Sequence, residues 1–190
     1  MNDPVLFIGI DIGIKRDTSA VAVIYKENGV YKEWGHKIST PTKNRVVNVH
    51  QDVSDAILKI CRACRVAGIW YDPYQFISEA QRIAEAGFGR LLFEVNQQTE
   101  MPAFSNTLET CITEGSLWLI KDQETKNHFL WCTAKETERG WRMVKRKQTK
   151  PIDYVVALGM ALYGASTAEG ELYHPSYDEE RHSVSMEMLP

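Results

Sequence analysis

The sequence lacks the features that would assign it to several large classes of proteins. No apolar run approaches the ~18 residues of a membrane span, so we expect no transmembrane segment. The opening Met-Asn-Asp-Pro has no basic stretch followed by an apolar one, which argues against a secretory signal. The chain also has no G-x-x-x-x-G-K-[ST], G-x-S-x-G or H-E-x-x-H motif. These absences argue against P-loop ATPases, nucleophile-elbow hydrolases and zinc proteases of that motif.

Cysteine and histidine are sparse, and neither forms a pattern that would hold a metal ion. The four cysteines lie at positions 61, 64, 111 and 132, and the C-x-x-C pair has no second pair at zinc-ribbon spacing. Because Cys61 and Cys64 share a face of a predicted helix, we expect reduced, core-facing thiols of a cytosolic protein. A redox or metal role for the pair is the alternative. The five histidines form no ligand cluster, so a histidine-based hydrolase is poorly supported.

The composition fits one globular domain with an acidic end. The 190 residues are 44% hydrophobic and 25% charged, which argues against wholesale disorder. The net charge of −3 is unevenly distributed, since residues 166–190 hold six acids and one arginine. Residues 1–165 hold 21 basic and 19 acidic side chains. We therefore expect a folded domain at 1–165 and a flexible tail at 166–190, and the overall charge does not count against DNA as a partner.

Hydrophobic periodicity predicts an α/β domain with a mixed sheet flanked by helices. The Asn-Gly pair at 28–29 is a strong hairpin signal, so the first three strands should be hairpin-linked and antiparallel, with parallel strands added later. Gly68 and Gly87 are expected to stop the first two helices, and Asn106 to cap the third. The expected strands are 5–11, 18–25, 30–38, 69–72 and 91–95, and the expected helices are 46–64, 75–86, 106–115, 126–136 and 152–165.

Three aspartates at the ends of predicted elements are the candidate catalytic residues. Asp11 ends the first strand among apolar residues, where a carboxylate is costly without a compensating partner. Asp72 ends the fourth strand, and Asp153 begins the last helix. If the first and fourth strands are neighbours, their C-terminal ends place Asp11 beside Asp72, and docking of the last helix adds Asp153. Carboxylates forced together repel, and a pair of Mg²⁺ ions would neutralise them and promote phosphodiester hydrolysis.

Each aspartate alone also has a structural interpretation. An aspartate before proline, as Asp72 is, often only starts a turn, and an aspartate at a helix start, as Asp153 is, often only caps it. Asp17 either closes the first hairpin or stands near Asp11 as an outer metal ligand. The constellation, and not any single member, favours a metal-dependent nuclease.

A basic stretch supplies a candidate surface for nucleic acid. Residues 135–150 hold seven basic side chains against two acidic ones, with Trp131 and Trp141 in and beside them. This mixture suits a phosphate backbone and an unstacked base, and a merely solvated hairpin is the alternative. The residues expected to bind DNA are Arg139, Arg142, Lys145, Arg146, Lys147 and Lys150.

Several short motifs follow one another in a distinctive order. The first two are Gly-Ile-Asp-Ile-Gly at 9–13, followed by Asp17, and Tyr-Asp-Pro-Tyr at 71–74. Next come Gln-Thr at 98–99, Leu-Glu at 108–109, Glu-Gly at 114–115 and Leu-Trp at 130–131. The last is Lys-Pro-Ile-Asp at 150–153, which leads into 157–161. In this order and spacing the chain, over about residues 5–165, resembles the nuclease domain of the large terminase subunit of tailed bacteriophages.

The resemblance implies an RNase H-like fold, two Mg²⁺ or Mn²⁺ ions, and endonucleolytic cutting of concatemeric double-stranded viral DNA during packaging in the host bacterial cytoplasm. By position, Asp11, Asp72 and Asp153 would be the metal-binding catalytic carboxylates, with Asp17 an accessory acid. The implied partners are the packaging ATPase motor, the small terminase subunit and the portal, with no membrane. Because large subunits carry a Walker motif that this chain lacks, we expect an isolated or separately encoded nuclease that cuts DNA without translocating it.

Two other classes compete with this interpretation. A Holliday-junction resolvase or another RNase H-like nuclease would use a similar set of acids. The segment 9–13 followed by 18–23 also resembles the first phosphate loop of actin-like and sugar kinases. Those enzymes need two copies of the core and a second glycine-rich loop, whereas Asp72 is followed by Pro-Tyr. A catalytically inactive DNA-binding module would have little use for the three acids.

Overall fold

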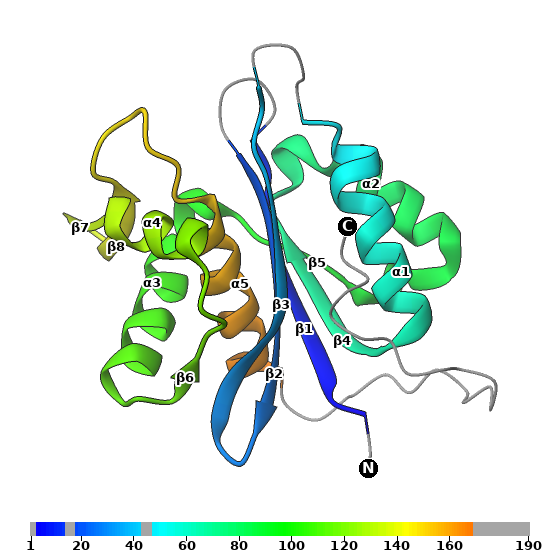
Figure 1. Cartoon of the computed structure of the whole chain (residues 1–190), viewed down its shortest axis with the longest axis horizontal. Helices are drawn as coiled ribbons and strands as arrows, with labels where there is room; N and C mark the ends of the chain where they lie inside the picture. The colour runs from blue at the N-terminus through cyan, green and yellow to red at the C-terminus, as the bar shows by residue number, and fades with distance from the viewer. Residues whose placement is uncertain (1–2, 14–17, 43–46, 169–190) are drawn as a thin grey trace.

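The domain is built on one six-stranded sheet that lies between two layers of helices (Figure 1). The computed structural model describes residues 3–13, 18–42 and 47–168. The strand order across the sheet is β5-β4-β1-β2-β3-β6. A separate two-stranded ribbon, β7–β8, stands beside the helices on one side.

The first three strands form the antiparallel half of the sheet, as the sequence predicts. They are β1 (Val5–Asp11), β2 (Ser19–Glu27) and β3 (Val30–Ser39). The turn between β2 and β3 holds Asn28 and Gly29 at φ angles of 51° and 81°, the left-handed conformations that an Asn-Gly hairpin turn requires. The turn residues therefore decide where the chain reverses.

The later strands add the parallel half, and the predicted fold class is confirmed. Strand β4 (Arg65–Tyr71) lies parallel to β1, and β5 (Leu92–Glu94) lies parallel to β4. On the other edge, the two-residue β6 (Leu117–Trp118) lies parallel to β3. The central strands β1 and β2 are thereby buried on both faces, which explains their continuous apolar sequence.

The helices divide between the two faces of the sheet. One face carries η1 (His50–Ser54) leading into α1 (Asp55–Ala63), then α2 (Ile77–Ile83), with the short turns η2 (Pro73–Gln75), η3 (Ala84–Phe88) and η4 (Gly89–Leu91) around them. The other carries α3 (Gln97–Thr113), α4 (Gln123–Trp131) and α5 (Asp153–Thr167). The ribbon pairs β7 (Cys132–Thr137) with β8 (Gly140–Lys145). None of the helices within the described ranges is long and apolar enough to cross a membrane.

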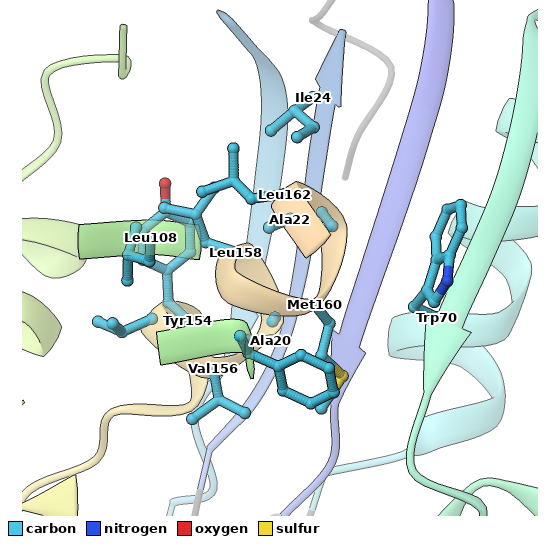
Figure 2. Packing of buried hydrophobic residues seen from close by; sticks show 14 of the residues in the cluster. Ala20, Ala22, Ile24, Trp70, Leu108, Tyr154, Val156, Leu158, Met160 and Leu162 are labelled. Carbon is cyan, nitrogen blue, oxygen red and sulfur yellow. The ribbon is translucent and has the colours of Figure 1, made fainter. Parts of the chain in front are cut away.

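Helix α5 is the centre of the larger core. Its side chains pack on Ala20, Ala22 and Ile24 of β2, and Leu158 and Leu162 of α5 lie against them in Figure 2. Eleven of the fifteen α5 residues are buried, because the sheet covers one side of the helix and α3 and α4 cover others. Met143 of β8 also lies close to Gly159 of α5. A second core lies between the sheet and α1–α2.

Gly9 lets α5 approach the sheet until their backbones touch. A Cβ atom at Gly9 would lie 1.9 Å from the Ala157 carbonyl oxygen and 2.7 Å from the Ala161 nitrogen. Only glycine fits there, since no shift of a side chain would relieve a clash with backbone. This contact fixes the position of α5 along β1, and so the place where the helix begins.

Several expected boundaries of helices and strands are wrong. The first helix ends at Ala63 rather than at Gly68, which lies inside β4 against the rings of Trp70 and Phe93. The third helix begins at Gln97, capped by Asn96 rather than Asn106, and it continues through Pro102. Residues 132–136 pair as a strand with β8 instead of extending α4. The last helix runs to Thr167, and residues 169–190 of the expected tail lie outside the described residues.

The cysteines of the C-x-x-C pair face the core, as expected. Both cysteines are free, Cys61 is buried in the core beneath α1, and Cys64 packs against the same core. Burial, with the neighbouring Cys64, raises the pKa of the Cys61 thiol to about 12. A thiol held protonated in this way is a poor nucleophile and a poor metal ligand.

Candidate active site

The sheet register brings Asp11 and Asp72 to the same edge. Ile10 of β1 is paired with Tyr71 of β4 in the parallel ladder. The next residue on each strand is an aspartate, so the two acids leave the sheet side by side at its C-terminal edge. The predicted site depends on β1 and β4 being neighbours, and this pairing is confirmed.

Asp153 reaches this edge because α5 begins there. Gly9 touches Ala157, and Asp153 lies about one helical turn before Ala157, just as Asp11 lies two residues beyond Gly9. Strand side chains alternate between faces, so Asp11 turns to the same face as Gly9, toward α5. Asp153 is buried, with 6% of its surface exposed, and Asp11 is partly buried.

The environment of Asp11 penalises its negative charge. Burial, followed by the charge of Asp153, raises the pKa of Asp11 to about 7, and the charge of Asp72 adds a smaller contribution. A hydrogen bond from Gln97 and the charge of Lys145 act in the opposite direction. A carboxyl group with so high a pKa next to other carboxyl groups is the arrangement expected where a cation or a proton is to be handled.

Each of the three carboxylates accepts a hydrogen bond from a neutral donor. Gln97 Nε2 donates to Asp11 Oδ1 at 2.8 Å, and the Tyr74 backbone nitrogen donates to Asp72 Oδ1 at 2.9 Å. The Thr18 hydroxyl donates to Asp153 Oδ2. The sequence reasoning missed Gln97 and Thr18. Gln97 could have been found from its place just beyond the C-terminal end of a parallel strand, but nothing local marks Thr18.

The sequence left open that Asp72 and Asp153 only cap a turn or a helix. The structure shows such a cap for Asp72 and not for Asp153. Asp72 does cap a turn, since it occupies the N-cap position of η2 and accepts from Tyr74. Asp153 does not cap α5, because Ile152 occupies the N-cap position and makes no side-chain cap. Burial of Asp153 therefore has no local helical explanation.

The donor chemistry fits a divalent metal, although the described atoms do not by themselves form a closed coordination site. Within residues 3–13, 18–42 and 47–168, no group of three or more His, Cys, Asp or Glu side chains is close enough to hold a metal ion. Asp17, the expected accessory acid, lies outside the described residues. Carboxylate oxygens are nonetheless the ligands that Mg²⁺ and Mn²⁺ prefer. Burial, followed by the charge of Asp153, raises the pKa of Asp11, and a bound cation would offset both effects.

The basic stretch covers the β7–β8 hairpin and the residues that follow β8, and its cations lie in two different surroundings. Their binding to DNA stays a prediction. Arg139, Arg146, Lys147 and Lys150 are exposed, and Arg142 is half-buried. Lys145, at the end of β8, lies close enough to Asp11 to lower its pKa, so this cation belongs to the carboxylate cluster. The Lys150 ammonium lies 4.7 Å from the centre of the Trp131 ring.

Comparison with known proteins gives a match in three dimensions and none in sequence. No protein-family model matches the chain, and a sequence search of curated proteins finds no match. The HK97 bacteriophage large terminase superposes with a TM-score of 0.74 over 86% of this chain at 17% identity. The nuclease of the large terminase from thermophilic phage G20c covers 84% of this chain with a TM-score of 0.65 at 15% identity. The chain has the fold of a large terminase nuclease domain.

The extent of the match differs between whole terminases and isolated nuclease domains. This chain spans 40% of the HK97 large terminase but 81% of the G20c nuclease. It likewise spans 87% of the large terminase nuclease domain of Thermus phage P74-26, with a TM-score of 0.60 at 14% identity. One structure of the G20c nuclease contains bound magnesium. The likeness thus establishes the fold, and the chemistry must be argued from the residues of this chain.

Proposed function

We propose that this chain is a metal-dependent endonuclease that cuts double-stranded DNA. Asp11, Asp72 and Asp153 are the catalytic metal-binding carboxylates, and Asp17 is an accessory ligand. One observation carries the proposal. Asp11 and buried Asp153 lie near each other at the C-terminal edge of β1 and β4, and the charge of Asp153 contributes to the raised pKa of Asp11. The likeness of the fold to terminase nucleases, one of which binds magnesium, supports it.

The residues of the chain have distinct roles in this reaction. Two divalent ions, when bound, activate the attacking water and stabilise the leaving oxygen of the phosphodiester. The three carboxylates hold those ions at the sheet edge, where α5 and the strands fix their positions. Exposed cations of the β7–β8 hairpin and of the residues that follow β8 hold the DNA backbone, since they attract phosphates without reading bases. Lys145 joins that surface to the carboxylates.

We place the cutting step in viral genome packaging. The substrate is concatemeric viral DNA in the host bacterial cytoplasm, and the partners are the packaging ATPase motor, the small terminase subunit and the portal. The proposal is supported by the match to the HK97 large terminase, of which this chain spans 40%. It requires no ATP hydrolysis by the chain itself.

Plasmid cleavage tests the activity directly. Wild type should nick and linearise supercoiled DNA in Mn²⁺ or Mg²⁺ and not in EDTA. Asp11→Asn, Asp72→Asn and Asp153→Asn should each lower the rate at least ~100-fold, because each removes a metal-binding charge from the transition state. Asp3→Asn, which changes an exposed aspartate that precedes β1, at the opposite end of the strand from Asp11, should leave the rate unchanged.

Three outcomes would overturn parts of the proposal. Cleavage that persists in EDTA would exclude the metal mechanism. Full activity of one Asp→Asn variant would remove that residue from the site. Cutting restricted to four-way junctions would replace packaging by a resolvase-like function.

A further inference from the structure

The hydrogen bonds to the three carboxylates form a pattern beyond the acids themselves. One oxygen of each carboxylate is engaged, by the Gln97 amide, the Tyr74 backbone N–H or the Thr18 hydroxyl. All three donors are neutral. They come from three different elements, the start of α3, the turn η2 and the residue before β2.

The backbone that carries Gln97 is held in place at the start of α3. Gln97 is the first residue of α3, directly after the cap residue Asn96, whose side chain accepts from Gln98 N at 2.9 Å. The Glu100 carboxylate accepts from Asn96 N at 2.6 Å, which completes the cap. Val95 N donates to Tyr71 O at 2.9 Å and ties the start of α3 to β4, the strand that carries Asp72.

Thr18 is fixed equally firmly on the opposite side of the site. It is 3% exposed and immediately precedes Ser19, whose hydroxyl donates to the Gly13 carbonyl at 2.9 Å. Gly13 N in turn donates to Ser19 Oγ at 3.2 Å. These bonds join Gly13, just beyond β1, to Ser19 at the start of β2, next to the threonine that donates to Asp153.

A neutral donor has a specific advantage beside a metal ligand. It fixes the orientation of the carboxylate, yet it leaves the negative charge that a cation requires. A lysine or arginine that donated to the same carboxylate oxygen would compete with the metal for it, whereas Lys145 acts on Asp11 through its charge. Donors of this kind, behind metal ligands, commonly control metal affinity by 10- to 100-fold, about the effect to be expected here.

We propose that Gln97 and Thr18 are positioning residues of the metal site, which orient Asp11 and Asp153 for divalent cations. The proposal rests on the proposed function, because it presupposes that these carboxylates bind metal. If the two hydrogen bonds only offset the burial of polar groups, their loss would lower stability and leave metal affinity unchanged.

The experiment measures Mn²⁺ binding to the folded chain by titration calorimetry, beside plasmid cleavage and melting temperature. Thr18→Val removes the hydroxyl at constant shape, and Thr18→Ser restores it. Gln97→Leu removes the amide, and Gln98→Leu is the matched control on the exposed side of the same helical turn. We expect Thr18→Val and Gln97→Leu to bind Mn²⁺ roughly 10-fold more weakly and to need correspondingly more Mn²⁺ for half-maximal cleavage. Thr18→Ser and Gln98→Leu should match wild type.

The outcomes separate this inference from the proposed function. Wild type that binds Mn²⁺ and cuts DNA, with unchanged affinity in Thr18→Val and Gln97→Leu, would overturn the positioning roles and leave the nuclease standing. A lowered melting temperature with unchanged affinity would assign both residues a structural role only. Wild type that neither binds Mn²⁺ nor cuts DNA would overturn both proposals.

Discussion

At the level of single residues, Asp11 differs from the aspartates that serve structure. Asp55 pairs with Arg82 at 2.7 Å, and Asp122 caps α4 by accepting from Thr125 N at 2.9 Å. The Arg82 hydrogen bond lowers the pKa of Asp55, and the Thr125 backbone hydrogen bond lowers that of Asp122. Burial and Asp153 do the opposite to Asp11. An acid that the fold makes harder to ionise costs stability, which is the usual cost of a functional site.

A second cluster of charges, around Glu33, is structural and sets a pH dependence. Glu33 is buried, and it accepts from the Tyr154 hydroxyl and from Ile120 N, each at 2.8 Å. His36 Nδ1 lies 2.8 Å from Glu33 Oε1. Burial opposes the charge of His36, but the hydrogen bond and charge of Glu33, with the charges of Asp122 and Glu124, outweigh it and raise the pKa of His36.

This cluster should make the domain less stable in mild base. Because the pKa of His36 is raised in the folded state, its contribution is fully present below the ordinary value of 6.5 and is lost as pH rises through the raised value. Wild type should exceed His36→Leu in unfolding free energy by about 1 kcal/mol at pH 6, and by less at pH 9. Urea unfolding at the two pH values measures this, and an equal difference at both would contradict it.

At the level of elements, the start of α5 is positioned from outside the helix. Tyr154 N donates to His128 Nδ1 at 3.2 Å, and no side chain at the N-cap position supplies that bond. Burial, followed by the charge of Lys145, lowers the pKa of His128 to about 4, so the ring stays neutral and Nδ1 can accept. Helix α4 thereby caps α5 one residue after Asp153.

The contact between α5 and β1 should tolerate no added carbon. Gly9→Ala would place Cβ within 1.9 Å of the Ala157 carbonyl oxygen, so the helix would have to move and carry Asp153 away from Asp11. We expect a loss of about 3 kcal/mol in unfolding free energy, together with loss of cleavage. Urea unfolding and plasmid cleavage measure the two effects.

A matched substitution distinguishes this contact from a general intolerance of alanine. At Gly89 an added Cβ meets only Ala84, with the Cβ of that residue at 3.2 Å and its Cα at 3.5 Å, and φ is −55°. Gly89→Ala should therefore change stability by less than ~1 kcal/mol. Normal stability and activity of Gly9→Ala would show that α5 does not fix the site.

At the level of the whole molecule, the basic hairpin and the carboxylate cluster lie on the same side of the sheet. The β7–β8 hairpin lies on the α5 side, the side on which the carboxylates converge, and α1 and α2 cover the other (Figure 1). Exposed cations of the hairpin and the acids at the sheet edge therefore belong to one face. A DNA backbone held by the first would pass near the second.

Removing positive charges from the hairpin and from the residues after β8 should weaken binding to DNA of every sequence alike. Arg139→Gln, Arg146→Gln and Lys147→Gln together should reduce the slope of log K against log salt by about one for each phosphate contact removed. Fluorescence anisotropy at several salt concentrations measures the slope. The control pair Lys59→Gln and Arg62→Gln, exposed on α1 at the opposite face, should leave it unchanged. An unaltered slope in the hairpin variant would mean that the hairpin points away from DNA.

Local signals account for what could be predicted of the fold. Continuous apolar runs mark β1 and β2, and Asn28-Gly29 marks their antiparallel partner, because turn chemistry and periodicity depend only on neighbouring residues. The predictions fail where contacts between residues far apart in the chain determine the secondary structure. Residues 132–136 form a strand because β8 pairs with them, and α3 passes through Pro102 because tertiary packing outweighs one lost hydrogen bond.

The same division runs through the candidate site. The order of residues along the chain is enough to predict the mixed α/β fold class and to single out Asp11, Asp72 and Asp153, because acids at the ends of apolar elements are visible in it. The folded chain is needed to show that β1 and β4 are neighbours, that Gly9 brings α5 to the sheet, and that Gln97 and Thr18 donate to carboxylates of the site. Hydrogen bonds and carboxylate repulsion depend on distances of a few ångströms between residues far apart in the chain, and local pattern carries no information about those distances.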